Sequence, residues 1–369
     1  MYLKKLTVYN FKNFEEATLG FSSKINCFTG SNGAGKTNLL DAIHYLSFTK
    51  SYFNLIDSQN IKHEADFFAV HGQFIRTGSL PDDVSCIQKR NTRKVVKMNT
   101  KEYERMADHI GEFPLVMVSP YDRDLINEGS DVRRKYIDSV ISQFDRAYLE
   151  DLIVYNKALA QRNALLKLFG EKRYFDDTSL EMWDEQMKAP ASRIHSRRQA
   201  FLNGFLPVFG RYFEYISQGK EKVDIVYHSD LEEAPMEQLL KANLQRDLSA
   251  RYTTGGVHKD DLELLINGYP VKKFGSQGQQ KSFVVAIKLA QFEYTRQVKQ
   301  FKPILLFDDI FDKLDSDRVD RIVKLVGDNS FGQVFITDTQ PERIHHIFKT
   351  TETDYRIFNV DSGQVAPAE

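Results

Sequence analysis

The stretch GSNGAGKT at Gly30–Thr37 decides how this sequence folds, because it matches the pattern G-x-x-x-x-G-K-[ST] at every fixed position. A short apolar run, residues 25–28, precedes it, and a helical pattern from about residue 36 to residue 46 follows. In a strand, glycine-rich loop and helix of this kind, free backbone N–H groups surround a phosphate. The sequence therefore predicts an α/β fold that binds a nucleotide.

The chemistry of this loop assigns the first site residues. Lys36 can reach the β- and γ-phosphates and is also a catalytic candidate, and Thr37 can offer its hydroxyl to Mg²⁺. ATP and magnesium are the expected cofactors. The predicted nucleotide-binding residues are Gly30, Ser31, Asn32, Gly33, Ala34, Gly35, Lys36, Thr37 and Asn38.

A second acidic motif, ILLFDD, runs from Ile304 to Asp309 and ends an apolar strand in two carboxylates. Strands of α/β folds deliver such groups to the edge where ligands bind. We expect Asp308 to hold Mg²⁺ and Asp309 to polarise an attacking water. An Asp-Asp pair after a strand is also a turn signal, but together with Gly30–Thr37 the functional interpretation is favoured.

A third motif, FGSQGQQKS from Phe274, precedes a long run of helical periodicity. Its glycines and serine leave N–H groups free at a helix N-terminus, which favours an anion. One nucleotide does not need two such helix ends unless the second approaches from another subunit. The alternative is a simple helix cap at Ser276.

The remaining periodicity predicts the domain organisation. From about residue 131 to residue 217 the apolar period is 3.6, with interruptions at Pro190 and Pro207, while strand-like segments lie on both sides. We expect a P-loop ATPase head built from both chain ends with an inserted helical lobe. The predicted parts are residues 1–120, with the P-loop and a basic hairpin, residues 121–218 as the helical lobe, and residues 219–369, with the other two motifs.

Composition narrows the class of protein. The chain has 369 residues with a formal net charge of −1, so any contact with phosphates must come from local patches. Its two cysteines suggest neither a metal site nor a disulfide framework. Because no apolar run approaches the length of a membrane span, we expect a cytoplasmic protein without a membrane partner.

Local basic patches are the candidates for DNA contact. The stretch KRNTRKVVKMNTK begins at Lys89, contains no acid and predicts a basic hairpin, although a charge-protected edge strand would look the same. Two further clusters lie in the helical block, one of Arg133, Arg134 and Lys135 and the other of Arg193, Arg197 and Arg198. Such helical rows are more often solvated faces or ion pairs than DNA contacts. The DNA candidates are Lys89, Arg90, Arg93, Lys94, Lys97, Arg133 and Arg134.

Several longer stretches carry a family resemblance. They are NFKNFEEATLGFS, GSNGAGKTNLLDAIHYLSFTKSY, INEGSDVRRKYID, YNKALAQRNALLK, GVHKDD, FGSQGQQKS and LLFDDIFDKLD. With them the chain resembles the RecF family of bacterial DNA repair and replication ATPases, relatives of ABC-type ATPases and of the heads of SMC proteins. The resemblance spans nearly the whole length.

The resemblance implies a function beyond what the motifs alone predict. It implies a two-lobed head that forms an ATP-dependent homodimer on double-stranded or gapped DNA and has weak, DNA-stimulated ATPase activity. It also implies cooperation with RecR and RecO in loading recombinase at single-strand gaps. Residues that would meet the nucleotide of the other subunit are Ser276, Gln277, Gly278, Gln279 and Asp315.

Departures from the ABC pattern separate this chain from transporter ATPases. Asp309 stands where ABC proteins usually have Glu, which fits slow turnover. No histidine follows the last strand, where ITDTQ stands, and no glutamine lies near Ser119-Pro120. Three alternatives are a transport ATPase subunit, an SMC-like structural protein with a long coiled-coil arm, and a related nuclease. This chain lacks the motifs that the first needs, the arm length that the second needs, and the added acidic metal domain that the third needs.

Overall fold

The computed structural model describes residues 1–54, 56–76, 80–172, 174–310, 316–327, 330–340, 342 and 354–368. The chain divides into two compact units. Unit 1 contains residues 1–122, 215–217 and 284–369, and unit 2 contains residues 123–214 and 218–283.

The central sheet of unit 1 has six strands in the order β15-β14-β3-β13-β12-β8. The five strands from β14 to β8 run parallel, and β15 is antiparallel to β14. The strands are β3 (Ile25–Thr29), β8 (Leu115–Val118), β12 (Ile304–Phe307), β13 (Val334–Asp338), β14 (Tyr355–Asp361) and β15 (Gln364–Pro367). Four of them, β3, β8, β12 and β13, are buried along their whole length, which explains why they read as continuous apolar runs.

A second, antiparallel sheet of unit 1 has the order β2-β1-β4-β5-β6-β7. Its strands are β1 (Tyr2–Phe11), β2 (Phe14–Gly20), β4 (Phe67–Ile75), β5 (Asp82–Lys89), β6 (Val95–Met98) and β7 (Lys101–Glu102). Buried and accessible residues alternate along β5, so one face of this sheet meets the core and the other is polar.

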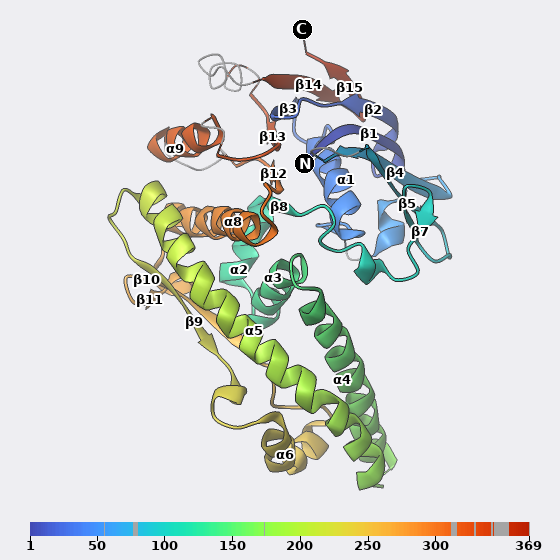
Figure 1. Ribbon diagram of the computed structural model, residues 1–369, viewed down its shortest axis with the longest axis vertical. Helices are drawn as coiled ribbons and strands as arrows, with labels where there is room; N and C mark the ends of the chain where they lie inside the picture. Colours follow the sequence, from blue (N-terminus) through green and yellow to red (C-terminus); the bar gives the residue numbers. More distant parts are fainter. Residues whose placement is uncertain are drawn as a thin grey trace. The chain divides into compact units, whose positions relative to one another are not determined.

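Helix α1 (Lys36–Phe48) fills the core between these two sheets, because eleven of its thirteen residues are buried. Leu39, Ile43 and Leu46 belong to one hydrophobic cluster with side chains from both sheets. Figure 1 shows α1 beside β1, β4 and β5. Both cysteines of the chain, Cys27 and Cys86, are buried on β3 and β5.

Unit 2 is built around two long helices, α4 (Arg146–Lys172) and α5 (Asp177–Ser217). A third helix, α6, meets α4, and a sheet of order β11-β10-β9 completes the unit (Figure 1). The other elements are α2 (Asp124–Asn127), α3 (Ser130–Ser142), β9 (Val223–His228), α6 (Met236–Ala250), β10 (Asp261–Ile266), β11 (Tyr269–Pro270) and α7 (Val271–Phe274). Helix α8 (Gln277–Lys299) begins in unit 2 and ends in unit 1, which also contains α9 (Ser316–Gly327).

Two expectations differ from the structure. Residues 219–283 belong to unit 2 rather than to the ATPase lobe, because Asp260 and Asp261 form ion pairs with Arg198 and Arg133 and thereby attach β10 to the helices. Pro190 and Pro207 do not interrupt α5, which is one helix of 41 residues. Proline removes one backbone hydrogen bond, and the buried side chains along α5 compensate for that loss.

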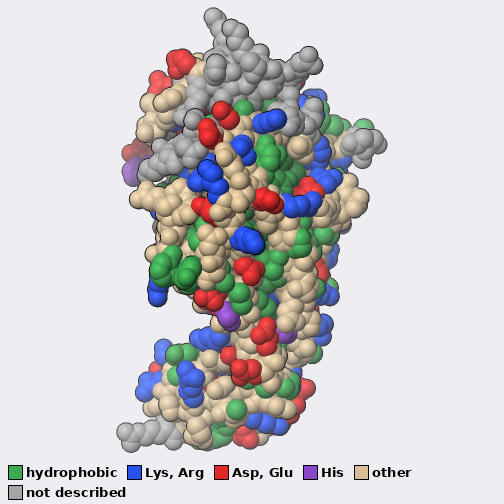
Figure 2. Space-filling model, turned by 90° about the vertical axis from the view of Figure 1, so that its left-hand side faces the viewer, with side chains coloured by type: hydrophobic (Ala, Val, Ile, Leu, Met, Phe, Trp, Pro, Cys, Tyr) green, Lys and Arg blue, Asp and Glu red, His purple; other side chains and the backbone are tan. Residues whose placement is uncertain are grey.

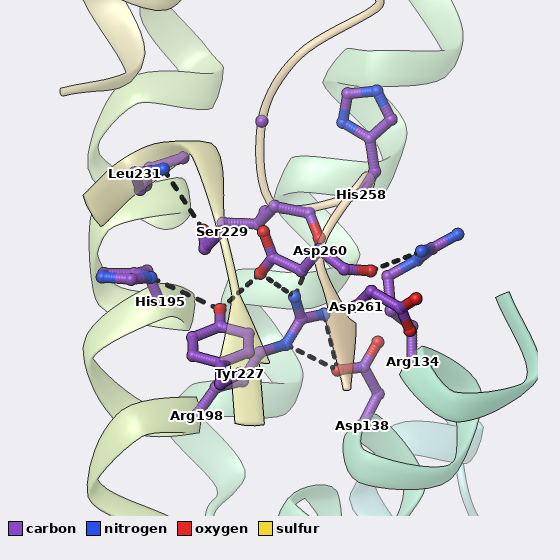
Figure 3. A network of polar contacts seen from close by, with 12 residues as sticks. Arg134, Asp138, His195, Arg198, Tyr227, Ser229, Leu231, His258, Asp260 and Asp261 are labelled. Carbon is purple, nitrogen blue, oxygen red and sulfur yellow. Dashed lines mark hydrogen bonds and ion pairs between the residues drawn. The ribbon is translucent and has the colours of Figure 1, made fainter. Parts of the chain in front are cut away.

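A buried polar network joins the helices of unit 2 to its sheet (Figure 3). Arg198 on α5 donates to Asp138 on α3 at 2.8 Å and to Asp260 at 2.6 Å. Tyr227 on β9 also donates to Asp260, and His195 lies within hydrogen-bond distance of Tyr227. Burial raises the pKa of Asp260, while the Arg198 guanidinium opposes that shift. Arg198 and Asp260 are almost completely buried, so each charge depends on the other.

A second buried arginine joins three helices. Arg162 on α4 donates to Asp184 on α5 and to Asp247 on α6, both at 2.6 Å. The motifs INEGSDVRRKYID, YNKALAQRNALLK and GVHKDD supply Asp138, Arg162 and Asp260. Some residues of the stretches that carry the resemblance therefore stabilise unit 2 from within.

We predict that Arg198→Ala lowers the free energy of unfolding by about 3–5 kcal/mol, because it leaves Asp138 and Asp260 without a buried counter-charge. Arg197→Ala is the control, since Arg197 is one third exposed and pairs with the partly exposed Asp145, and it should cost about 1 kcal/mol or less. Chemical denaturation followed by circular dichroism measures both. Equal losses would contradict the structural role assigned to Arg198.

Candidate functional site

Parallel strands bring the sequence motifs to one edge of the central sheet. Strands β3, β13 and β12 are neighbours, with Phe28 opposite Thr337 and Ile336 opposite Phe307. The P-loop, residues 30–37, follows β3, and Asp308 follows β12. Because these strands end at the same edge, segments about 270 residues apart in the chain meet there.

The backbone of the P-loop requires its glycines. Gly30 has a φ of 149°, and a Cβ atom there would lie 2.1 Å from the carbonyl oxygen of Val360. Gly35 is the N-cap of α1 with a φ of 119°, and no side chain caps this helix. The first N–H groups of α1 are therefore left for an external acceptor, as phosphate binding requires.

The Lys36 side chain is folded into the loop. It is only 5% exposed, and Nζ donates to the carbonyl oxygens of Gly30 and Ser31, both at 2.9 Å. A buried ammonium held by two neutral carbonyls keeps its charge available for phosphate oxygens. The P-loop is thus closed around the Lys36 ammonium, the group that would bind the phosphates of a nucleotide.

Asn13, which sequence reasoning missed, braces the P-loop from the turn between β1 and β2. Its Nδ2 donates to the carbonyl oxygen of Ala34 at 2.9 Å, and its Oδ1 accepts from Asn38 Nδ2 at 2.7 Å. Asn38 is one of the predicted nucleotide-binding residues, and its side chain is thus hydrogen-bonded to Asn13. An asparagine in a turn is an ordinary pattern, so nothing in the sequence alone distinguishes Asn13.

Asp308 joins the P-loop helix to two strands. Thr37 Oγ1 donates to its Oδ1 at 2.8 Å, and Thr337 Oγ1, at the end of β13, donates to the same atom at 2.9 Å. Burial raises the pKa of Asp308 to about 6, against the opposing effect of these two hydroxyls. Thr337 was not predicted as a site residue, and its place in ITDTQ gives little signal.

The oxygen donors at this point suit Mg²⁺. Neighbouring ligands of an octahedral Mg²⁺ lie about 3 Å apart, given metal–oxygen distances of about 2.1 Å. Thr37 Oγ1 and Asp308 Oδ1 are 2.8 Å apart, and both are hard oxygen ligands. Thr37 and Asp308 would therefore hold the ion, with phosphate oxygens and waters completing its coordination.

Asp309 is held beside Asp308 in an uncommon backbone conformation. Its φ is 43°, and its N–H donates to Thr337 Oγ1 at 2.9 Å. A left-handed aspartate is uncommon and carries strain that the surroundings must maintain. Thr337 thus positions both carboxylate residues of the ILLFDD motif.

The third motif forms a reciprocal cap at the start of α8. Ser276 Oγ accepts from the N–H of Gln279 at 3.2 Å, and Gln279 Oε1 accepts from the N–H of Ser276 at 2.7 Å. This is a capping box, so Ser276 does cap the helix. The hydroxyl proton can still be donated outward, because the cap uses only the oxygen. Ser276 and Gln277 are exposed and Gly278 is half-buried, while Asp315 lies outside the described residues.

The candidate DNA residues of the hairpin β5–β6 differ in availability. Lys94 is held by Asp57 at 2.7 Å and is only 14% exposed, so it is a structural residue. Lys89, Arg90 and Arg93 are exposed and Lys97 is half-buried. Lys97 pairs with Ser85, which pairs with His71, so these side chains alternate onto the polar face of the sheet.

The helical arginines are engaged inside unit 2. Arg133 Nε and Nη2 donate to the two carboxylate oxygens of Asp261 at 2.7 and 3.0 Å, and Arg134 donates to the carbonyl oxygen of Asp260 at 2.5 Å. Arg193 pairs with Asp151 on α4. These contacts favour the ion-pair alternative for both helical clusters.

Comparison with known proteins identifies the family. The family model for the RecF/RecN/SMC N-terminal domain matches residues 2–365. The "DNA replication and repair protein RecF" of Flavobacterium johnsoniae is 49% identical over 360 residues, which cover 98% of this chain and 100% of that protein. The chain belongs to the RecF family of DNA replication and repair proteins. The RecF of Bacteroides thetaiotaomicron is similar, at 48% identity over 99% of this chain and 98% of that protein.

Solved structures agree with this assignment. The recombination mediator protein RecF-ATP of the RecFOR pathway superposes with a TM-score of 0.89 and 32% identity, covering 100% of this chain and 98% of that one. The Smc head domain of Pyrococcus furiosus, at 17% identity and a TM-score of 0.59 over 100% of this chain and 96% of that one, shares the fold. The predicted ATPase-head fold and the resemblance to the RecF family are confirmed. Among the described residues, no helix is both long enough and apolar enough to cross a membrane.

We predict that Asp308→Asn stabilises the nucleotide-free protein. A carboxyl whose pKa is raised to about 6 in the folded state holds its proton more tightly than the unfolded chain does. Wild-type stability should therefore rise as the pH falls from about 7 to 4 and be lost as the pH rises through 6, by up to about 3 kcal/mol. The variant should lack this contribution.

Thermal unfolding in EDTA between pH 4 and pH 8 measures the difference between variant and wild type, with the exposed Asp83→Asn as the control. A constant difference across this range would contradict the raised pKa assigned to the buried carboxyl of Asp308.

Proposed function

We propose that this protein is an ATP-dependent DNA-binding protein of recombinational repair and replication restart. The observation that carries the proposal is the P-loop site itself, an uncapped α1 with Lys36 in the loop and Asp308 against Thr37. The full-length similarity to a RecF solved with ATP supports it. ATP would bind along residues 30–38, with Mg²⁺ held by Thr37 and Asp308.

The start of α8 supports a dimer. Its capping box leaves the Ser276 proton free, and the helix dipole favours a negative group at this end. P-loop residues 30–37 already provide one phosphate site, so we assign Ser276, Gln277, Gly278 and Gln279 to the γ-phosphate bound by a second copy. ATP would then hold two copies together, and its hydrolysis would release them.

The chain's residues suit slow hydrolysis. Lys36 would balance the charge on the β- and γ-phosphates, and bound Mg²⁺ would add to that neutralisation. Asp309 would orient the attacking water and accept its proton. Its side chain is one methylene shorter than glutamate, and its backbone is restrained by Thr337, so we expect weak ATPase activity.

The polar face of the antiparallel sheet is the proposed DNA contact. A concavity of about 450 Å³ on this face is lined by Lys5, Thr7, His71, Ser85 and Lys97 among others. Lys89 lies on the same face, since it is four residues from Ser85 on β5. Lysines and hydroxyls spaced across a sheet fit phosphates rather than base edges, so we expect recognition of DNA shape or junctions.

The cellular role follows from the family. RecF of the RecFOR pathway is described as a recombination mediator, and we propose that this chain likewise helps to load recombinase at single-strand gaps in the cytoplasm with RecR and RecO as partners. A transport ATPase subunit and an SMC-like structural ATPase are the alternatives.

We predict that Mg-ATP converts the wild-type protein to a dimer in sedimentation velocity experiments. Lys36→Ala should abolish ATP binding, because it removes the cation of the phosphate site. Ser276→Arg should bind ATP normally as a monomer but fail to dimerise, because its bulk would block the partner's phosphate. Asp309→Asn should retain the dimer for longer than wild type.

Dimers that survive Ser276→Arg would refute the assignment of this loop to a second subunit. A wild-type protein that binds ATP and stays monomeric would leave Ser276 as a helix cap alone.

We predict that Lys89→Glu combined with Lys97→Glu weakens binding of gapped duplex DNA about equally for all sequences. The slope of log affinity against log salt should decrease by about two, because two phosphate contacts are lost. Lys157→Glu with Lys167→Glu, on the exposed face of α4, makes the same charge change and should have little effect. Fluorescence anisotropy across a salt series measures both, and equal losses would point to long-range charge instead of contact.

A further inference from the structure

Unit 2 has a basic and aromatic surface directly ahead of the α8 N-terminus. We call it the α7 patch, and its residues are Lys220, Lys222, Tyr269, Lys272, Lys273 and Phe274. Tyr269 is 60% exposed and Phe274 is 63% exposed, and their ring centroids lie 5.3 Å apart. Exposed apolar rings in contact with one another are typical of surfaces that pack against something else.

Backbone contacts make this patch one continuous surface. Asn267 and Gly268 have φ values of 50° and 79°, as in the tight turn that joins β10 to β11 and places Tyr269. The N–H of Asn267 donates to the carbonyl oxygen of Lys222 at 2.7 Å, so the start of β9 lies against this turn. Gln279 on α8 donates to Glu221 at 2.6 Å and attaches the same segment to the capping box.

The four lysines of the patch take no part in the ion pairs that stabilise their unit. All four are exposed, and none forms a side-chain hydrogen bond or ion pair with any residue in the described part of the chain. Arg133, Arg162 and Arg198 of the same unit are each neutralised by aspartate. Charge that the fold does not use for its own stability is available to an external anion. Figure 2 shows the side on which β10 and β11 lie in Figure 1, with hydrophobic side chains at the surface among those of Lys and Arg.

We propose that the α7 patch docks on a second copy of this chain, against the face that carries its loaded nucleotide site. This inference rests on the proposed dimer and extends it from the capping box to the neighbouring surface. Phe274 is two residues from Ser276, so a partner phosphate at Ser276 would place the partner's site next to the patch. Tyr269 and Phe274 would supply the apolar contact.

Charge complementarity explains why such docking would require ATP. The P-loop site without nucleotide contains Lys36, and a triphosphate adds more negative charge than Mg²⁺ removes, beside Asp308 and Asp309. The lysines of the patch would therefore be attracted to a loaded site more strongly than to an unloaded one. The patch would act as a sensor of the partner's nucleotide.

The test uses the full-length protein with Mg²⁺ and the slowly hydrolysed analogue ATPγS. Lys272→Glu with Lys273→Glu should raise the dimer dissociation constant at least tenfold at low salt, and the effect should shrink as salt increases. Lys157→Glu with Lys167→Glu is the matched control and should change the dissociation constant less than twofold. Tyr269→Ser with Phe274→Ser should weaken the dimer with much less salt dependence. Nucleotide affinity measured on dilute monomer should be the same in all variants.

The outcomes separate this inference from the function on which it rests. If the wild-type protein does not dimerise with the analogue, both the proposed dimer and the docking of the α7 patch are refuted. A wild-type dimer together with an equally tight dimer of Lys272→Glu, Lys273→Glu would overturn the docking of the α7 patch alone. If that variant instead loses affinity for a single-stranded oligonucleotide while its dimer is unchanged, the patch binds nucleic acid and the proposal is wrong.

Discussion

Asp308 is the constraint on which unit 1 depends. One carboxylate oxygen accepts from Thr37 on the P-loop helix and from Thr337 on the neighbouring strand, and so connects three segments that are distant in the chain. The carboxyl is 3% exposed, and its burial costs free energy that these two hydroxyls only partly offset. A cation at this point would remove that cost, so the arrangement is better suited to the loaded state than to the free one.

Unit 2 distributes its charge in two different ways. Arg162 and Arg198 are buried and neutralised, and their ion pairs join the helices of the unit to one another and to β10. The lysines around α7 remain in solvent, without side-chain partners among the residues that the structure describes. A count of basic residues would treat these groups alike, although the first contributes to folding and the second is available for association.

The sequence allowed the nucleotide site to be predicted because its chemistry is local. GSNGAGKT contains its own glycines, lysine and threonine, and the apolar runs before Asp308 and around residues 334–338 indicate buried strands. Asn13 and Thr337 were missed because each acts through a contact with a distant segment and belongs to a common residue pattern. The placement of residues 219–283 failed for a similar reason, since strand-like periodicity does not reveal which helices a strand will join. Pro190 and Pro207 were read as breaks because local propensity gives no account of the packing along α5.

The burial of Cys27 and Cys86 has a consequence for the redox behaviour of the protein. Burial raises the pKa of the Cys86 thiol to about 12 and also raises the pKa of Cys27, so neither forms an appreciable thiolate at neutral pH. Peroxides and alkylating agents react with the thiolate, and these are the only cysteines in the chain. The folded protein therefore presents no reactive sulfhydryl under oxidative stress, and its cysteines become reactive toward oxidants only when unit 1 opens.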